Sequence, residues 1–562
     1  MFCENASDIA SALHASLEVK GNNMTTTRRD FLATAGAAGG LTALQGHSSS
    51  ASAHQSEGRD DLFTTFDEDW QRQVDAGFYD PRTHMFLDDH HIDKLEGLQR
   101  KMHTPQRVGD QAVIKVEKPW EGVAMAGLRN SVAYDEKEKL FKFWYRCYSK
   151  EHYGAGVSSS RWAYATSPDG VHWDRPNLGL VDFQGSKDNN LVHISPTLDT
   201  GALLINVVID DRDPDPRRRY KAIGMAAHPL QEGEIHVPYL DKTGSRCTGG
   251  LFVAYSPDGV RWTMRRGWLM GMICRDGAVR HGFDKRTNKW LLWQRPSFRF
   301  GKRILGVCYS EDFERWTPPE MGLVNDEHDI DGFQFYELVS ADSPDGGYIG
   351  LVGCSGWQGQ GLYAGESMPQ LVFARDPRVW TRVSREPFMY RGQAGEFDEG
   401  VVMPMRPITL GDETYIFYYA KNRGEHWGNP TTDGKSITTS SLGLAKMPRD
   451  RWVSLTPGSG EGTLVSSMIC FADKQLRVNA NAKGGSIRVE LQDLSGKPAE
   501  GFTLAECDPI TSDSFDQLVT WNGGKSDLTD LLGSAVQHPP DVARVLRLKF
   551  FLNNAELFSF LC

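Results

Sequence analysis

Cysteine is scarce in this chain, at nine of 562 residues, and the nine make no Cys-x-x-Cys pair. No cysteine spacing typical of metal ligands occurs, so the sequence predicts neither a zinc site nor a cofactor. Eight of the nine follow Ala53, and several, such as Cys147 and Cys308, fall in segments with a strand pattern. We therefore expect buried free thiols, although export would also permit disulfides.

Positive charge and long apolar runs are also lacking. The 62 Lys and Arg residues are outnumbered by 73 Asp and Glu, for a formal net charge of −11, and no long basic run occurs. This balance argues against nucleic acid as a partner. No apolar stretch reaches the length that spans a bilayer, so we expect no membrane span. The remaining composition is that of an ordinary globular protein, long enough for two or three domains.

The N-terminal part carries an export pattern. Two arginines and a polar residue, within Thr27–Leu32, precede a mildly apolar stretch rich in Ala and Gly. This is the twin-arginine pattern, and Ala51-Ser52-Ala53 offers a small-residue cleavage site. We expect residues 1–53 to be an N-terminal extension and signal peptide of a periplasmic or secreted protein. A disordered polar tail is the alternative, and Met24 leaves the true start codon open.

Five short runs ending in tryptophan punctuate the chain. Each follows a turn rich in Asp, Gly or Pro that leads into an aromatic strand, and Ser, Asp and Gly in the runs favour tight turns. The runs are 165–173, 254–262, 308–316, 373–380 and 445–452. Their spacing is wider and less even than the roughly 40–45 residues of a WD40 blade. Five copies of a multi-strand unit predict an all-β fold, a five-bladed β-propeller over residues 119–455, with the repeat residues as scaffold.

Two further segments flank the predicted propeller. Residues 54–118 are expected to be a lead-in. Within it, His90 and His91 stand beside acidic residues and could bind a metal, but we favour the interpretation that they form a solvated turn. After a Gly-rich joint at 458–462, apolar and polar residues alternate with period two. A C-terminal β-sandwich over residues 463–562 fits this pattern.

A five-bladed propeller followed by a β-sandwich resembles the furanosidase-type glycoside hydrolases, above all family 32, with families 43, 68 and 130 sharing the propeller. The resemblance implies retaining or inverting cleavage of a glycosidic bond by carboxylates around the propeller axis. The chain departs from family 32, whose Asn-Asp-Pro-Asn-Gly motif is replaced by residues 127–131. Arg212-Asp213-Pro214 has the letters of the family's Arg-Asp-Pro motif but falls in a turn. The family's Glu-Cys pair is absent, and residues 274–276 occupy its region. These departures argue against invertase-like activity.

Residues at the start of each innermost strand converge at one opening of a propeller. Glycoside hydrolysis needs a carboxylic acid and a second carboxylate, for which Asp276 and Glu399 are our first choice, with Asp331 and Asp398 as orienting or stabilising groups. The expected substrate-binding residues are Glu121, Arg129, Asn130, Arg275, Arg280, His281, Gln334, His426 and Trp427. As the alternative to these roles, Asp276 and Asp331 would each only form a turn. Glu399 would line the opening without reacting, and the segment that carries Glu121 would only latch the ring.

Arginines recur near the same opening, at positions 129, 275, 280 and 423. Because guanidinium groups bind carboxylate and sulfate bidentately, they favour an anionic sugar, uronic or sulfated, unless they pair with nearby Asp and Glu. The expected partner is therefore a carbohydrate. The rival interpretations are a non-catalytic carbohydrate-binding propeller, a family 130-type phosphorylase and a sialidase-like protein, which needs six blades. The sequence leaves the sugar, the stereochemistry and the oligomeric state open.

Overall fold

The structure of this chain is a computed structural model. The structure describes residues 83–122, 124–125, 131–148, 160–195, 203–229, 239–240, 246–265, 282–295, 303–357, 366–422, 439–458, 460–471, 473–532 and 545–562. Nearly all regular structure in these ranges is β-strand, which confirms the all-β prediction. The exceptions are single turns, η1 (Pro119–Glu121), η5 (Pro216–Arg218) and α2 (Thr529–Leu532). No helix among the described residues is long and apolar enough to cross a membrane.

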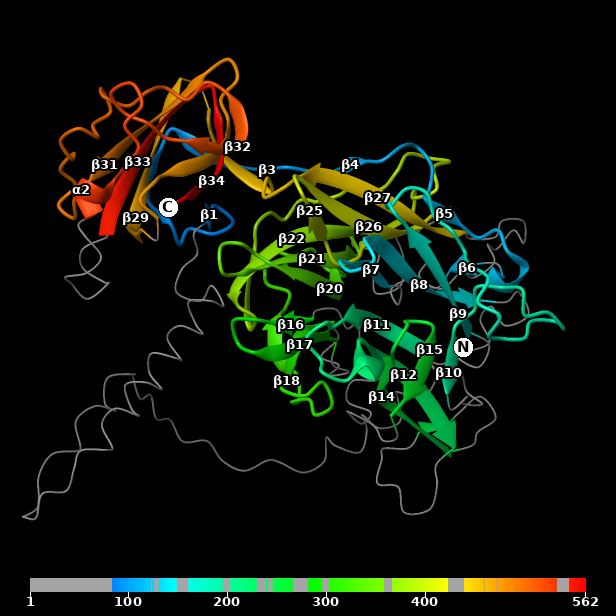
Figure 1. The fold of residues 1–562 in the computed structure, drawn as a ribbon. Coiled ribbons are helices and arrows are strands. Elements are labelled where there is room, and N and C mark those ends of the chain that lie inside the picture. The colour runs from blue at the N-terminus through cyan, green and yellow to red at the C-terminus, as the bar shows by residue number, and fades with distance from the viewer. Residues whose placement is uncertain are drawn as a thin grey trace, which may run out of the picture. The chain divides into compact units, whose positions relative to one another are not determined.

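Five sheets, here called blades 1 to 5, follow one another along the chain (Figure 1). Blade 1 contains β6 (Ala124–Met125), β7 (Ser131–Asp135), β8 (Leu140–Tyr148) and β9 (Ser160–Ser167). Blade 2 contains β10 (His193–Ser195), β11 (Leu203–Ile209), β12 (Tyr220–Pro229), β13 (Tyr239–Leu240), β14 (Arg246–Ser256) and β15 (Arg261–Met264). Blade 3 contains β16 (Phe283–Asp284), β17 (Lys289–Gln294), β18 (Leu305–Ser310) and β19 (Glu320–Leu323).

Blades 4 and 5 are joined by one parallel pair, Ser367 with Val401. Blade 4 contains β20 (Gln334–Asp342), β21 (Tyr348–Ser355), β22 (Ser367–Asp376) and β23 (Val379–Arg382). Blade 5 contains β24 (Val401–Pro404), β25 (Ile408–Leu410), β26 (Glu413–Lys421) and β27 (Ser440–Pro448). Antiparallel pairing between chain neighbours dominates in all five blades.

The outer edge of blade 5 is completed by a segment that precedes blade 1. β4 (Gln106–Arg107) and β5 (Ile114–Lys115) both pair antiparallel with β27. Part of the expected lead-in is therefore the closing strand of the last blade. Because an unpaired strand edge is open to association with other chains, this pairing also protects the edge of β27.

Five hydrophobic clusters fill the grooves between neighbouring blades, and aromatic rings dominate several of them. Each cluster draws mainly on two blades: 1 and 2, 2 and 3, 3 and 4, 4 and 5, and 5 and 1. Representative pairs, in that order, are Trp144 with Trp262, Val253 with Trp290, Trp293 with Tyr348, Leu351 with Ile416, and Phe143 with Phe417. The succession returns to blade 1, so the five sheets form a closed ring.

A cavity of about 470 Å³ runs where the five sheets meet. Its lining comes from residues 131–136, 206–212, 282–285, 341–342 and 405–410, one stretch from each blade. These stretches contain or adjoin β7, β11, β16, β20 and β25, which identifies the inner edges of the blades. The ring therefore surrounds one axis, as expected of a propeller.

The tryptophan runs form tight turns. In the first, Asp169 accepts hydrogen bonds from the backbone N–H groups of Val171 and His172, and the Trp173 indole N–H donates to the carbonyl of Gly170 at 2.8 Å. The same indole bond recurs at Trp262, Trp316 and Trp380. Gly170 adopts a φ of +78° directly against Phe417 of blade 5. The repeat residues therefore act as scaffold, as the sequence predicted.

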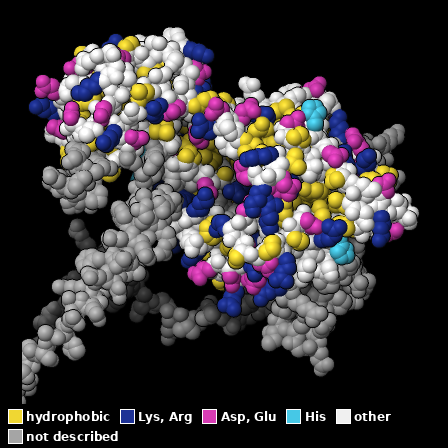
Figure 2. Space-filling view, in the orientation of Figure 1, with side chains coloured by type: hydrophobic (Ala, Val, Ile, Leu, Met, Phe, Trp, Pro, Cys, Tyr) yellow, Lys and Arg dark blue, Asp and Glu magenta, His cyan; other side chains and the backbone are white. Residues whose placement is uncertain are grey.

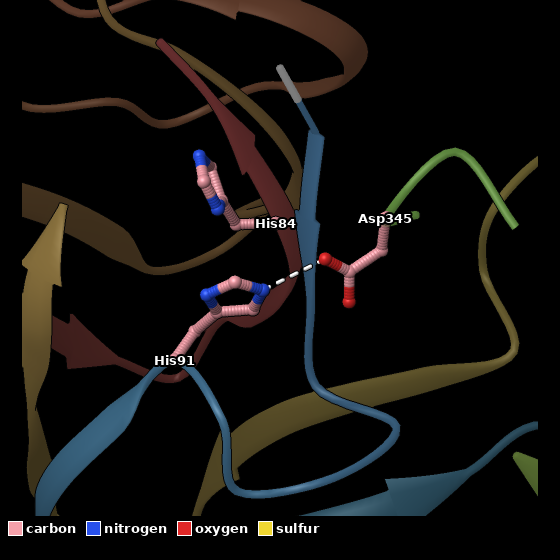
Figure 3. A group of neighbouring side chains, drawn as sticks. All are labelled: His84, His91 and Asp345. Carbon is pink, nitrogen blue, oxygen red and sulfur yellow. Dashed lines mark hydrogen bonds and ion pairs between the residues drawn. The ribbon is translucent and has the colours of Figure 1, made fainter. Parts of the chain in front are cut away.

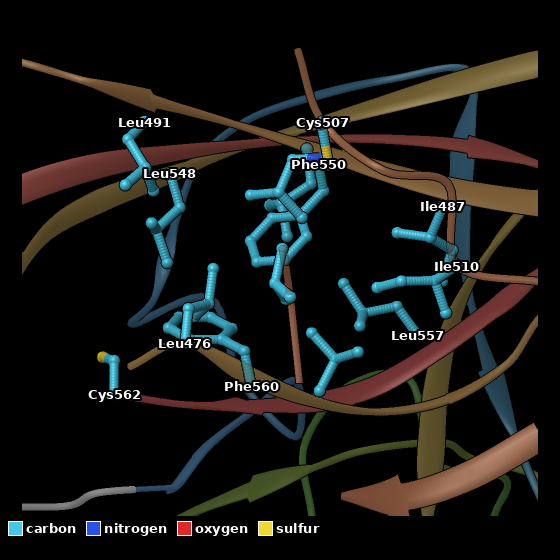
Figure 4. Close-up of a cluster of buried hydrophobic side chains, with 14 of the residues drawn as sticks. Leu476, Ile487, Leu491, Cys507, Ile510, Leu548, Phe550, Leu557, Phe560 and Cys562 are labelled. Atoms are coloured by element: carbon cyan, nitrogen blue, oxygen red, sulfur yellow. The ribbon is translucent and has the colours of Figure 1, made fainter. Parts of the chain in front are cut away.

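A second unit consists of two sheets around one core. One sheet contains β2 (Ile92–Glu96), β29 (Glu461–Cys470), β31 (Ser486–Gln492) and β33 (Val545–Asn553). The other contains β1 (Thr83–Met85), β3 (Leu98–Met102), β28 (Val453–Pro457), β30 (Arg477–Asn481), β32 (Asp513–Leu518) and β34 (Glu556–Leu561). Leu548 of the first sheet and Leu557 of the second both belong to the core between them (Figure 4), the arrangement of a β-sandwich. Strands β1–β3 add to it the residues just before the propeller.

We expect Gly170→Ala to destabilise the ring. A Cβ at this position would approach the Phe417 ring to 2.9 Å, and the positive φ is itself unfavourable for alanine. Together these effects should lower the free energy of unfolding by about 2–4 kcal/mol. Gly179→Ala is the matched control, because its φ is +66° with nothing within 4 Å. Urea denaturation that gave equal losses for both variants would contradict the packing of Gly170 between blades 1 and 5.

A buried carboxylate ties blade 1 to blade 2. Asp135 accepts hydrogen bonds from Arg219 at 2.8 and 2.9 Å and from the Tyr220 hydroxyl at 2.8 Å, and its Oδ2 lies 2.9 Å from the Lys142 ammonium. Burial alone would raise the pKa of Asp135, but these partners outweigh it and hold the pKa well below its ordinary value. The ionised form is thus stabilised by folding.

Asp135→Asn should therefore lower stability at neutral pH. A depressed pKa in the folded state contributes stability above the unfolded value, and that contribution disappears as the pH falls. The difference in melting temperature between wild type and variant should narrow below about pH 4. Asp182→Asn, at an exposed turn, serves as the control with little change at any pH. A difference that stays constant down to pH 3 would contradict this assignment.

Candidate functional site

In a propeller the inner strands begin at the same end of the ring, and we call that end the mouth. Eight of the residues expected there lie outside the described residues: Arg129, Asn130, Arg275, Asp276, Arg280, His281, His426 and Trp427. The described part of the chain contains the other five, Glu121, Asp331, Gln334, Asp398 and Glu399. They fall into three kinds of environment.

Glu399 lies just before β24, the first strand of blade 5, and is partly exposed. Its Oε2 accepts a hydrogen bond from the backbone N–H of Gly395 at 2.7 Å, and its own carbonyl accepts one from Arg391 at 2.9 Å. Arg391 also pairs with Glu366, which directly precedes β22 of blade 4. Among the described residues, the other oxygen of Glu399 has no hydrogen bond. Glu399 is thus a fixed carboxylate with one oxygen available to a ligand.

Glu366 is a site residue that the sequence did not indicate. It precedes the third strand of blade 4, whereas the search for site residues considered the region before each first strand. It reaches the mouth because Ser367 and Val401 pair across the junction of blades 4 and 5. An acidic residue directly before a strand was the available signal, but nothing in the sequence predicts which strands start side by side.

Asp398 has a different environment from its neighbour. Its side chain is fully buried, and its Oδ2 accepts hydrogen bonds from Arg107 of β4 at 2.8 Å and from the Tyr418 hydroxyl at 3.0 Å. Burial raises the pKa of Tyr418, and the charge of Asp398 raises it further. Arg107 also donates to the carbonyl of Tyr390. Asp398 therefore anchors its loop to the closing strand, while its Oδ1 is buried and makes no hydrogen bond among the described residues.

Glu121 is also buried, and both of its oxygens are used. Oε1 accepts hydrogen bonds from the Tyr145 hydroxyl at 2.6 Å and from Arg175 at 2.7 Å. Oε2 accepts from the backbone N–H groups of Glu117 and Lys118. These bonds fasten the segment before blade 1 to that blade. This is the latch that the sequence offered as the alternative to substrate binding, and it leaves no oxygen for a sugar.

Gln334 is the first residue of β20, and Asp331 lies in the turn just before it. Asp331 is exposed and has no side-chain hydrogen bond or ion pair within the described ranges. Gln334 is buried, and its side-chain oxygen accepts a hydrogen bond from the backbone N–H of Arg303 at 2.8 Å. Gln334 therefore positions the neighbouring blade, while Asp331 is free to face solvent or a ligand.

Two arginines of blade 3 flank Tyr336 on β20. The guanidinium carbons of Arg295 and Arg303 lie 4.3 and 4.8 Å from the centroid of its ring. Arg295 also donates a hydrogen bond to the Tyr336 carbonyl at 3.1 Å. These cationic groups were not among the expected residues. On the face in Figure 2, Lys and Arg side chains and Asp and Glu side chains are both present.

No family model and no curated protein matches this chain. Similar solved structures include an N-acetylgalactosamine deacetylase from F. plautii, with 14% identity over 63% of this chain and 96% of its own, at a TM-score of 0.39. A β-1,2-mannobiose phosphorylase from Listeria innocua has 13% identity over 61% of this chain and 96% of its own, at a TM-score of 0.38. The α-L-arabinofuranosidase PaAbf62A from Podospora anserina has 14% identity over 61% of this chain and 97% of its own, at a TM-score of 0.39. At such values the function has to be argued from the site itself.

Asp398→Asn should destabilise the protein rather than act on chemistry directly. The variant keeps the size of the side chain but leaves Arg107 and the Tyr418 hydroxyl facing a neutral group, which should cost about 1–3 kcal/mol of unfolding free energy. Glu396→Gln, at an exposed position of the same loop, should stay within about 0.5 kcal/mol of wild type. Chemical denaturation measures both. Full stability together with loss of turnover in Asp398→Asn would instead assign Asp398 to catalysis.

Proposed function

We propose that this protein is an exported carbohydrate-active hydrolase that binds a glycan at the mouth and cleaves a glycosidic bond there. The observation that carries the proposal is the environment of Glu399, a partly exposed carboxylate held by the Gly395 N–H at the start of an inner strand. Its neighbours Arg391 and Glu366 fix its main chain. A carboxylate with one oxygen anchored and the other available suits a nucleophile or a general base.

The second carboxylate of the proposed pair is Asp276, the sequence-based candidate ahead of blade 3. In this scheme one carboxyl group protonates the leaving oxygen and the other attacks the anomeric carbon or activates water. Asp331, exposed at the start of β20, is the candidate for orienting the sugar. Asp398, being buried, contributes by holding the loop that carries Glu399.

The proposed substrate is an oligosaccharide or polysaccharide, with an anionic sugar as the finer proposal. The sequence places four arginines ahead of strands or in loops near the mouth, and Arg295 and Arg303 add cationic groups around Tyr336. Guanidinium groups recognise carboxylate and sulfate bidentately. The twin-arginine pattern supports action outside the cytoplasm, where polysaccharides are encountered.

A non-catalytic, glycan-binding propeller is the second candidate, and one observation favours it. Of the four carboxylates expected to act in catalysis, Asp398 is fully buried in an ion pair. That leaves Glu399 and Asp331 as the two that stay open in the described part of the chain. Binding without turnover on a broad glycan panel would establish this candidate.

Glu399→Gln should abolish most hydrolysis while preserving the fold, since glutamine retains the hydrogen bond from Gly395 but can neither attack nor accept a proton. On the best substrate of a polysaccharide panel, kcat should fall by at least about 10²-fold, and Asp276→Asn should behave alike. Glu396→Gln, three residues away and exposed, is the matched control with unchanged kcat. Wild-type turnover in Glu399→Gln would remove Glu399 from the chemistry.

The same assay, run with and without inorganic phosphate, separates hydrolysis from phosphorolysis. A hydrolase releases free sugar at the same rate in both conditions. Release of a sugar phosphate only when phosphate is present would replace the proposal by a phosphorylase of the family 130 type.

A further inference from the structure

Three buried side chains from two distant parts of the sequence meet between the sandwich and blade 4. They are His84 on β1, His91 just before β2, and Asp345 in the turn between β20 and β21. The potential ligand atoms of the three, one from each side chain, all lie within 4.8 Å of one another. Figure 3 shows both imidazole rings and the carboxylate facing a common space, with His91 Nε2 at 2.7 Å from Asp345 Oδ1.

His84 has one ring nitrogen left without a partner. Its Nε2 lies 3.4 Å from the Cys562 sulfur, and the ring stacks on Phe560, with centroids 4.6 Å apart. Its Nδ1 is buried and makes no hydrogen bond within the described residues, and it lies on the side of the ring toward His91 (Figure 3). A metal-binding histidine commonly has its other nitrogen fixed by an outer partner, which is the position of Cys562 here.

The charges around the cluster leave room for a cation. Arg375 binds Asp88 through two hydrogen bonds of 2.8 and 2.9 Å and reaches Asp345 Oδ2 at 3.0 Å. Two carboxylates thus face one guanidinium group, whose Nη2 also lies 3.4 Å from His91 Nε2. The charges of Asp88, Asp345 and Arg375 alone leave one negative charge in excess. Asp345 Oδ1 lies 2.7 Å from His91 Nε2 (Figure 3).

We propose that His84, His91 and Asp345 bind a divalent transition-metal ion that fastens the sandwich to blade 4. Two imidazole nitrogens and one carboxylate oxygen are the ligand set that suits Zn²⁺. The site lies at the turn that ends β20, whereas the mouth lies where β20 begins. The ion is therefore structural and stands apart from the proposed glycan chemistry.

The favoured sequence interpretation of this region was wrong for one of its two histidines. His90 is exposed, as a solvated turn requires, but His91 is buried. Spacing rules for metal ligands did not reveal the cluster, because Asp345 is 254 residues away from His91.

The test uses the full chain, stripped of metal by a chelator and titrated with Zn²⁺ and, separately, Co²⁺. We expect uptake of about one equivalent, a rise in melting temperature, and Co²⁺ visible absorption bands typical of nitrogen and oxygen ligands in a low-coordinate site. His84→Gln should weaken uptake at least about 10-fold, since it removes a ring nitrogen that has no hydrogen bond among the described residues. His90→Asn, the adjacent exposed histidine, is the matched control and should bind as wild type does.

Two results would overturn the proposal. One is a wild-type chain that takes up no Zn²⁺ and shows no Co²⁺ bands, which would leave the cluster as an ion-pair network of His91, Asp345 and Arg375. The other is uptake that persists unchanged in His84→Gln, which would put the ion elsewhere. The wild-type spectrum decides the first result even if the variant fails to fold.

Discussion

The ring depends on apolar side chains that fill the grooves between neighbouring sheets. A blade of four strands has two apolar faces, and neither can be buried within the blade itself. Trp144 in blade 1 illustrates the solution: its ring packs against Tyr220 of blade 2, and its N–H donates to the carbonyl of Gly259. Five such grooves in succession bring the last sheet back against the first, so each blade is stable only with both neighbours present.

Adjacent residues at the mouth have opposite roles. Asp398 and Glu399 both lie in the turn before β24. Asp398 is buried and accepts hydrogen bonds from Arg107 and Tyr418, while Glu399 is partly exposed. The buried carboxylate fixes the loop, and the loop fixes the exposed carboxylate. A site built this way gains its rigidity from the closing strand rather than from the site residues alone.

The parts of the fold that the sequence predicted were those with a repeated local signal. The tryptophan runs predicted the number of blades because Ser, Asp, Gly and Trp form the same tight turn in several copies of the run. β4 and β5 went unpredicted because each is two residues long and its partner lies more than 300 positions away.

The site was harder to predict because its residues are also brought together by partners that are distant in the sequence. Glu399 could be chosen from its place before an inner strand, but Glu366 enters the mouth through a pairing between two blades. Nor does any local pattern distinguish a buried Asp398 from an exposed one. Glu121 looked like a funnel residue, yet its four hydrogen bonds come from partners on three separate segments. Long-range contacts decide these roles, and a single sequence carries little information about them.

The pairing of β4 and β5 with β27 sets an order of events during synthesis. Residues 106–115 leave the ribosome early, yet the strand that receives them ends at Pro448. β1 likewise cannot pair until β34 has been made, because Thr83 of β1 pairs with Leu561 of β34. The propeller can therefore close only after β27 has emerged, and the sandwich only after β34 has emerged. Until then the nascent polypeptide must keep β4, β5 and β1 unpaired with these strands.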